Sequence, residues 1–193
     1  MKTNPSDFLF EAAALKRLKR TGWQILGENQ ESIAEHTFMV VVISYVLAKK
    51  FKVNLEKILI MALFHDFEEG RTGDVYKLAD LYTKTDKKKA LRDVFSHLEK
   101  PKSIIDILKD YHQANTLAAK IVKDADTLAL CIELKQLVEK GNIHAKEWLT
   151  ANLDSLKTSE GKKLGSDLVK TDSQNWWKKE RKILHNRLKK VGK

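Results

Sequence analysis

Apolar residues recur every three or four positions along most of the chain, which is the pattern of amphipathic α-helices. No segment sustains the two-residue alternation of a strand, and the hairpin dipeptides Asn-Gly and Asp-Gly do not occur. The two prolines, Pro5 and Pro101, leave long helical segments uninterrupted. We therefore predict an all-α protein.

Capping residues mark where several helices begin and end. Ser32, followed three residues later by Glu35, predicts a capping box before a strongly apolar segment, and Asn54 can cap the next helix. Gly70 and Gly141 are placed to end helices. The predicted helices cover residues 7–20, 33–50, 54–70, 102–112, 117–140 and 143–171, with a solvated helix in the charged stretch 79–100 and glycine breaks at Gly161 and Gly165.

The length and composition favour one domain. A chain of 193 residues with 42% hydrophobic residues can bury one proper core. Its longest apolar run, residues 38–48, is shorter than the roughly 20 residues of a membrane span, and the N-terminal segment lacks the layout of a signal peptide. We expect a soluble, cytoplasmic protein. Cys131 has apolar neighbours and is expected to be a buried thiol without a role.

The formal net charge of +10 is concentrated at the C-terminus. Residues 178–193 contain eight Lys or Arg and one Glu, a net of +7. We expect residues 1–171 to form the domain and residues 172–193 to form a basic amphipathic helix packed on it or on a partner subunit. Binding of nucleic acid by the basic face is the less favoured alternative. The apolar stripe of this helix consists of Trp176, Ile183, Leu184 and Leu188.

The stretch LIMALFHDFEEGRTGD, residues 59–74, places many charged groups at the end of an apolar helix. His65 and Asp66 lie where an ionised carboxylate is costly unless it is paired or binds a metal. His36 and Asp126 also stand among apolar residues, each in a different predicted helix. Two imidazoles and two carboxylates that meet would suit a divalent transition metal.

Each of these residues also has an ordinary interpretation. His36 alone could be a core or capping histidine, Asp126 a surface acid, and a His-Asp dipeptide occurs by chance in many proteins. The combination favours a metal site, because the sequence contains no competing phosphate-binding or dinucleotide-binding glycine motif.

The order His36, His65-Asp66 and Asp126 resembles the H…HD…D signature of the HD-domain metal-dependent phosphohydrolases. The surrounding sequence is similar to the branch of this superfamily that contains 5′-deoxynucleotidases, and the similarity covers residues 9–137. The resemblance implies a single-domain HD-domain helical bundle in which these four residues bind the metal. The matching segments are LKRTGW (18–23), ESIAEHT (31–37), ALFHDFEEGRTGD (62–74) and KDAD (123–126).

The resemblance also suggests catalytic roles. Glu69 matches the catalytic glutamate of the branch, and Asp74 matches the acid of its TGD turn. Glu69 is one helical turn beyond His65, so it could exchange a proton with metal-bound water or with a leaving oxygen. For Asp74, capping of a turn is an equally good interpretation. Glu68 is expected to face solvent.

The resemblance also suggests residues that bind the substrate. Trp23 matches a tryptophan near the substrate, although it could equally be a packing anchor. Some members of the branch have arginine immediately before this tryptophan, whereas this chain has Gly22. The cation that binds phosphate is therefore open between Arg20, Lys16, Arg17 and Arg71.

The resemblance implies hydrolysis of deoxynucleoside 5′-monophosphates with one divalent metal ion. Manganese or cobalt is favoured, with iron, nickel, zinc or magnesium as alternatives, and a homodimer is expected. The alternatives are an HD-domain hydrolase of a nucleoside triphosphate or cyclic phosphodiester, and a di-iron HD oxygenase. The oxygenase would need extra histidines; His97 and His112 lie in the right interval but lack the expected context.

Overall fold

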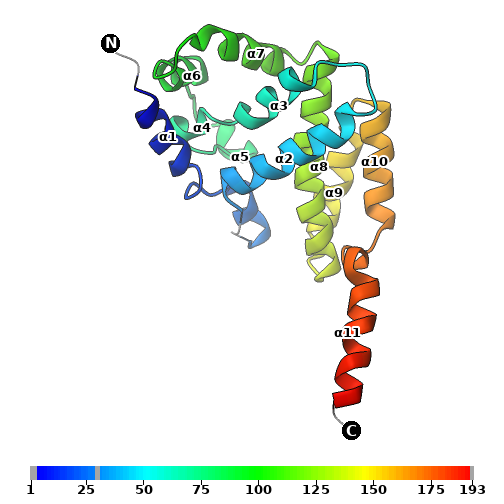
Figure 1. Ribbon diagram of the computed structural model, residues 1–193. Coiled ribbons are helices and arrows are strands. Elements are labelled where there is room, and N and C mark those ends of the chain that lie inside the picture. The colour runs from blue at the N-terminus through cyan, green and yellow to red at the C-terminus, as the bar shows by residue number, and fades with distance from the viewer. Residues whose placement is uncertain (1–3, 29–30, 192–193) are drawn as a thin grey trace.

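The computed structural model describes residues 4–28 and 31–191, and it is all-α, as the sequence predicts. Within these ranges there is no β-strand, and an isolated antiparallel bridge joins Lys19 to Ser32. The helices, most of them labelled in Figure 1, are α1 (Pro5–Ala14), η1 (Thr21–Leu26), α2 (Ile33–Ala48), α3 (Leu55–Phe64), α4 (Glu69–Thr72), α5 (Lys77–Asp80), α6 (Lys87–Phe95), α7 (Pro101–Gln113), α8 (Leu117–Glu139), α9 (Ala145–Asp154), α10 (Ser159–Lys170), η2 (Asn175–Trp177) and α11 (Lys178–Val191).

Helix α8 is central to the packing. Helices α2, α3, α7, α9 and α10 all contact it (Figure 1), and α2 also packs on α3. Their apolar side chains form the largest core cluster, which includes Val40, Ile43, Leu47, Ile58, Met61, Ile121, Val122, Ala125 and Leu128. Because helices surround α8 on several sides, the polar residues on its buried faces must find partners inside the protein.

Three predicted helix boundaries are confirmed. Ser32 and Glu35 form the capping box: Ser32 Oγ accepts from Glu35 N at 3.2 Å, and Glu35 Oε2 accepts from Ser32 N at 2.7 Å. Asn54 caps α3 by accepting from Lys57 N at 3.0 Å. Gly141, with φ of +97°, follows the end of α8.

Helix α3 ends at Phe64, earlier than predicted. The Nδ1 atom of His65 bonds the carbonyl oxygen of Ala62 at 2.8 Å. A continuing helix would offer that carbonyl to the N–H of Asp66. The turn that follows therefore contains the His-Asp pair, and helical periodicity cannot be extrapolated through it.

Two other predicted ends are wrong. The chain adopts a positive φ of +73° at Gly73, at the end of α4, and Gly70 lies inside that short helix. Helix α1 stops at Ala14 instead of continuing to residue 20. The backbone of Arg20 instead donates to the carbonyl of Glu31 at 2.9 Å, because the chain here runs beside the segment that leads into α2.

Gly161 and Gly165 do not break a helix, contrary to our prediction. Both lie inside α10, where the chain approaches its neighbours closely. A Cβ atom at Gly161 would lie 2.3 Å from Oδ2 of Asp124, and one at Gly165 would lie 2.8 Å from a methyl carbon of Leu153. These glycines allow α10 to pack against α8 and α9.

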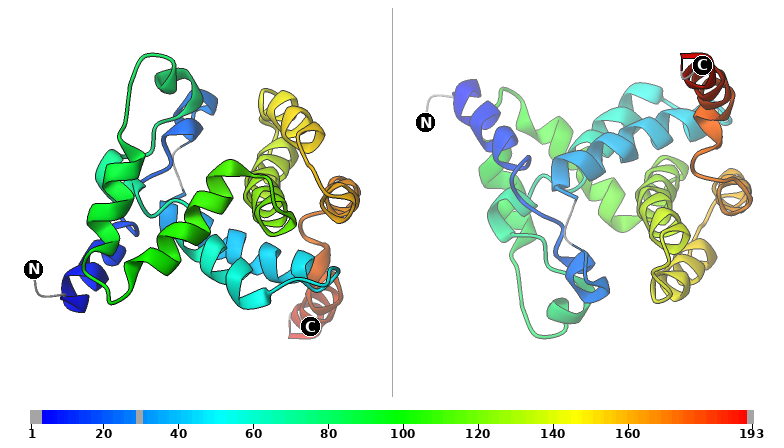
Figure 2. Two further views of the ribbon diagram at one scale, coloured as in Figure 1. Left: turned by 90° about the horizontal axis from the view of Figure 1, so that it is seen from above. Right: turned by 90° about the horizontal axis from the view of Figure 1, so that it is seen from below.

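In the described chain the C-terminal helix does not lie against the domain, the first of the two packings expected for it, and packing on a partner subunit stays a prediction. Figure 1 shows α11 extending away from the helical body, and in the views of Figure 2 it is seen nearly end-on at the edge of the molecule. Trp176 is 82% exposed and Leu188 is 70% exposed. The apolar stripe is narrow and flanked by lysines and arginines, which favour contact with water.

Cys131 is buried, as predicted, and burial raises the pKa of its thiol to about 12. In residues 4–28 and 31–191, no helix has the length and apolar character required to span a lipid bilayer.

Candidate active site

Helices α2 and α8 bring His36 and Asp126 into contact. His36 is fully buried, and its Nε2 lies 3.0 Å from Oδ1 of Asp126. Burial and the nearby Arg20 lower the pKa of His36. Burial alone would raise the pKa of Asp126, but its hydrogen bond with His36 and the nearby His65 hold it well below its usual range. The pair therefore favours a neutral imidazole beside an ionised carboxylate, and both are good metal ligands.

His65 and Asp66 lie in the turn after α3. The bond from His65 Nδ1 to the carbonyl of Ala62 directs Nε2 toward Asp66, whose Oδ2 lies 3.1 Å away. Burial disfavours the charged imidazolium of His65. The negative charges of Asp66 and Asp126 outweigh this effect of burial and raise the pKa of His65 to about 9. Burial likewise disfavours the ionised form of Asp66, but His65 lowers its pKa to about 2. The carboxylates thus favour positive charge at this position.

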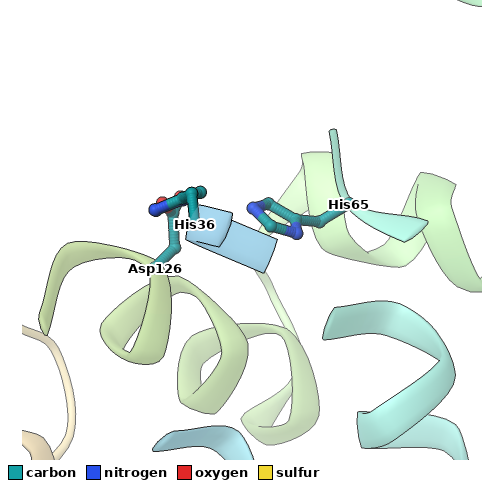
Figure 3. A group of neighbouring side chains, drawn as sticks. All are labelled: His36, His65 and Asp126. Atoms are coloured by element: carbon teal, nitrogen blue, oxygen red, sulfur yellow. The ribbon is translucent and has the colours of Figure 1, made fainter. Parts of the chain in front are cut away.

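Three side chains from separate parts of the chain converge, as expected from the sequence. One ligand atom from each of His36, His65 and Asp126 lies within 4.8 Å of the others (Figure 3). Asp66 adjoins this cluster through His65 but does not belong to the group of three. The side chains of Asp66 and Asp126 are 20% and 29% exposed, so solvent reaches the carboxylate side.

The donor atoms of this cluster fit a divalent transition metal. His36 Nδ1 and His65 Nε2 are both buried, and neither makes a hydrogen bond of good geometry among the described residues, although carboxylate oxygens of Glu31 and Asp66 lie 3.9 Å and 3.1 Å from them. Orphaned buried nitrogens are costly, and a metal ion can satisfy one as a ligand. His36, His65 and Asp126, with Asp66 beside them, are therefore the residues that could hold a metal.

Glu69 lies at the start of α4 and is 8% exposed. Within the described part of the chain, its buried Oε2 atom lacks a hydrogen-bond partner. Burial, Asp66 and Asp74 raise the pKa of Glu69 to about 9. A carboxyl group of this kind can hold a proton close to the cluster, as a general acid requires.

Glu68 is buried at 1% exposure, so the prediction that it faces solvent is wrong. The prediction extended the helical period of α3 through residues where the helix has already ended. Glu68 Oε1 lies 3.8 Å from Nε2 of His112 and 3.9 Å from Nζ of Lys87. Burial raises its pKa to about 7. Glu68 thus connects the active-site turn to α6 and α7.

Asp74 joins the segment after α4 to η1. Its Oδ2 accepts from the backbone N–H of Thr21, and its carbonyl oxygen accepts from Thr21 Oγ1 at 2.9 Å. Figure 2 shows the loop between α4 and α6 reaching the same side of the molecule as η1. These contacts support a structural role for Asp74, and its catalytic role stays a prediction.

Arg20 and Trp23 meet at Glu31. Arg20 Nη1 lies 3.9 Å from Glu31 Oε2, which also accepts from Trp23 Nε1 at 3.1 Å. Asp126 and Asp66 also act electrostatically on Arg20; together with Glu31 they outweigh burial and raise its pKa. The structure thus places Arg20 within electrostatic reach of the cluster. Trp23 is only 4% exposed and belongs to the same apolar core cluster as Leu134, which favours the packing interpretation of this residue.

Arg71 forms an ion pair with α1 and not with the candidate metal cluster. Its Nε and Nη2 atoms donate to Glu11 of α1 at 2.6 and 2.9 Å, a bidentate ion pair at the surface. A guanidinium engaged in this way is poorly placed to bind phosphate at the cluster. Between Arg20 and Arg71, the geometry therefore favours Arg20 as the arginine that binds substrate.

The sequence analysis missed Tyr111. This buried residue of α7 donates its hydroxyl to Oδ2 of Asp126 at 2.9 Å, so both oxygens of Asp126 have partners. Its ring centroid lies 5.6 Å from that of His65. The only available signal was a tyrosine near the end of an amphipathic helix, and the contact with Asp126 depends on how α7 packs on α8.

Comparison with known proteins agrees with this geometry. The profile of the HD-domain family matches residues 12–168. The chain is 32% identical to a 5′-deoxynucleotidase of Saccharomyces cerevisiae over 176 residues, which cover 84% of this chain and 72% of that protein. It is 30% identical to a 5′-deoxynucleotidase of Escherichia coli over 175 residues, covering 80% and 86% of the two chains.

Solved structures share the fold. A conserved hypothetical protein from Pyrococcus furiosus superposes with a TM-score of 0.74 and 29% identity, over 86% of this chain and 99% of that one. A protein from Magnetospirillum magnetotacticum, described as a predicted metal-dependent phosphohydrolase, superposes with a TM-score of 0.63 and 20% identity. This superposition covers 86% of this chain and 89% of that protein.

Proposed function

This chain belongs to the HD-domain family and is one of its phosphohydrolases, and on that premise we propose that it removes phosphate from deoxynucleoside 5′-monophosphates. The observation that carries the proposal is the convergence of His36, His65 and Asp126 beside the buried acid Glu69. The relatives named as 5′-deoxynucleotidases support the choice of substrate.

We propose His36, His65, Asp66 and Asp126 as the residues that hold one divalent metal, with manganese or cobalt favoured. When bound, such an ion supplies Lewis-acid polarisation of a phosphoryl oxygen and a water of lowered pKa. The protein residues determine where this chemistry takes place. Ala62 fixes the ring of His65, and Tyr111 orients the carboxylate of Asp126.

The remaining groups of the site would handle charge and protons. Arg20 would bind oxygens of the phosphate and offset their negative charge. Glu69 would hold a proton on its carboxyl group and deliver it to the departing 5′-oxygen of the sugar. Asp74 would hold η1 in place through Thr21. Because Arg20 immediately precedes η1, this contact would also keep Arg20 near Glu69.

Among the alternatives, a di-iron oxygenase is not favoured. It would need a second metal position that includes a histidine such as His112, which lies beside Glu68. Burial and the nearby Lys123 and Lys87 lower the pKa of His112 and keep its imidazole neutral, but the two ammonium groups would repel a second metal ion there. Hydrolysis of a nucleoside triphosphate or a cyclic phosphodiester could use the same cluster, and a substrate panel distinguishes these activities.

We also propose a homodimer. Helix α2 exposes an apolar face, and α11 exposes another, so a second copy could cover either. Sedimentation equilibrium should give twice the 22.2 kDa mass of the chain, and a monomer mass at micromolar concentration would contradict the proposal. The large exposed apolar residues of these helices are Phe38, Val42, Tyr45 and Val46 in α2, and Ile183, Leu184 and Leu188 in α11.

The function is tested by measuring release of inorganic phosphate. Chelator-treated protein is reloaded separately with manganese, cobalt, magnesium or zinc and given deoxy- and ribonucleoside 5′-monophosphates, triphosphates and cyclic phosphodiesters. We expect release from deoxynucleoside monophosphates that requires a transition metal. Turnover of only triphosphates or cyclic phosphodiesters would reassign the substrate, and no turnover by metal-loaded protein would contradict the proposal.

The role of Glu69 is tested by Glu69→Gln, which keeps the volume of the side chain and removes its acidity. We expect metal content to be unchanged and kcat to fall about 10²- to 10⁴-fold, the usual contribution of a general acid. Glu99→Gln, at an exposed position, is the matched control. An unchanged kcat in Glu69→Gln would transfer the role of acid to Asp74.

A further inference from the structure

Lys123 lies on α8 one turn before Asp126, so the two side chains share a face of the helix. Its Nζ is held 3.6 Å from the centroid of the Tyr111 ring. The hydroxyl of the same ring donates to Asp126. The ammonium group is thus positioned by a residue that also contacts the candidate metal cluster.

The charge of Lys123 lacks a direct partner. Across residues 4–28 and 31–191, no carboxylate oxygen lies within 4.0 Å of Lys123 Nζ, so the ammonium group forms no ion pair there. By contrast, Arg20 faces Glu31 at 3.9 Å and Arg71 is bound by Glu11. A half-buried ammonium without a counterion is unfavourable, and an anionic ligand would remove that cost.

The surroundings of Lys123 combine other lysines with the carboxylates of the candidate metal cluster. Lys77 and Lys87 act on Lys123 electrostatically, as do Asp126 and Asp66. Positive groups of α5 and α6 thus lie near enough to Lys123 of α8 to act on its charge, and an anion bound at Lys123 would also be attracted by them. Lysine binds phosphate as a compact point charge, without the planar geometry that arginine imposes.

We propose that Lys123 binds an oxygen of the phosphate group of the substrate, and that the ring of Tyr111 holds its ammonium in place. This inference rests on the proposed function, because it takes the phosphate to be the one that is removed. A phosphate that reaches the His36–His65–Asp126 cluster also comes within range of Lys123, since Asp126 and Tyr111 connect them. Arg20 and Lys123 would then be the two cations that contact it.

The test compares Lys123→Met, which keeps an unbranched stem over the ring but removes the charge, with Lys123→Arg, which keeps the charge. Lys120→Met, an exposed substitution on the same helix, is the matched control. On manganese-loaded protein, one measures the Kd of inorganic phosphate, the KM for deoxynucleoside 5′-monophosphates, and separately the Kd of manganese.

We expect Lys123→Met to weaken phosphate binding about tenfold and to raise KM by a similar factor, with the Kd of manganese within about twofold of the parent protein. Lys123→Arg should recover part of the loss, and Lys120→Met should match the parent. An unchanged phosphate Kd in Lys123→Met would overturn the inference. A large loss of manganese affinity would also overturn it, because Lys123 would then act through Asp126.

Failure of the proposed function gives a different result. If the parent protein binds phosphate in a Lys123-dependent way but releases none from the nucleotide panel, the anion site stands and the proposed reaction is wrong. If the parent protein hydrolyses deoxynucleotides and Lys123→Met does so with unchanged KM and phosphate Kd, the reaction stands and the role of Lys123 is wrong.

Discussion

Helix α8 carries two aspartates, two residues apart, whose surroundings differ completely. Asp124 faces α10 and is 1% exposed; its carboxylate accepts from the backbone N–H groups of Lys157 and Thr158 and from the Thr158 hydroxyl. Asp126 faces the other side and contacts ionisable side chains, His36 and Tyr111. A carboxylate satisfied by backbone groups stabilises a fold, whereas one held among titratable groups remains available to a ligand.

The two sides of α8 are therefore expected to respond oppositely to the same substitution. Changes on the Asp126 side should affect metal binding and turnover. Changes on the Asp124 side should affect the free energy of unfolding, with little change in turnover per folded molecule.

Asp126→Ala should have the largest effect. It removes one of the three converging ligand atoms, so metal content and phosphate release should fall to the level of chelator-treated protein. Metal analysis of the purified variant and the phosphate assay measure both. An active variant that retains its metal would refute the assignment of Asp126 as a ligand.

Asp124→Ala should mainly reduce stability. It leaves three donors of Lys157 and Thr158 without an acceptor, and the free energy of unfolding should fall by about 3–5 kcal/mol. Urea unfolding measures this loss, with Asp154→Ala at an exposed position as the control. If metal affinity fell and stability did not, the contrast between the two sides of α8 would be wrong.

Tyr111→Phe should weaken the site without dismantling it. It removes the hydrogen bond to Oδ2 of Asp126 and keeps the ring beneath Lys123. Loss of such a supporting contact typically costs about 10- to 100-fold in metal affinity or activity. Competition with a chelator of known affinity measures the metal Kd, and Tyr82→Phe, at an exposed position, is the control. Equal metal affinity in Tyr111→Phe and the parent would remove Tyr111 from the site.

Thr158→Val should have the smallest effect of the four. Its hydroxyl donates to Asp124 Oδ2 at 2.6 Å and accepts from Gly161 N at 3.0 Å, capping α10. We expect a loss of about 1–2 kcal/mol in the free energy of unfolding and an unchanged KM. Thr150→Val in α9 is a matched control, because that residue is exposed. A loss of activity with unchanged stability would contradict the structural role of this side of α8.

The sequence was most informative where local physics decides the structure. Helical periodicity and capping side chains located α2 and α8 closely, because both depend on residues three or four positions apart. His36, His65 and Asp126 could be singled out because charged or titratable groups among apolar neighbours are costly without a partner.

Features that depend on distant residues could not be predicted in this way. The burial of Glu68 follows from the end of α3 and from the approach of His112 and Lys87. The glycines of α10 make room for neighbouring helices, and periodicity cannot distinguish such glycines from helix breaks. The sequence allowed Arg71 as a phosphate ligand, because its ion pair with Glu11 joins residues that lie far apart in the chain and could not be predicted.

The sequence by itself thus determined the all-α fold class, the extents of α2 and α8, the single buried cysteine and the identity of the costly polar residues. Only the tertiary structure decided which partner each polar residue has, that α11 extends from the body, that Tyr111 contacts Asp126, and that Lys123 lies over the Tyr111 ring. The physical reason is that a helix is stabilised by contacts between near neighbours, whereas a site is assembled by packing residues that lie far apart in the chain.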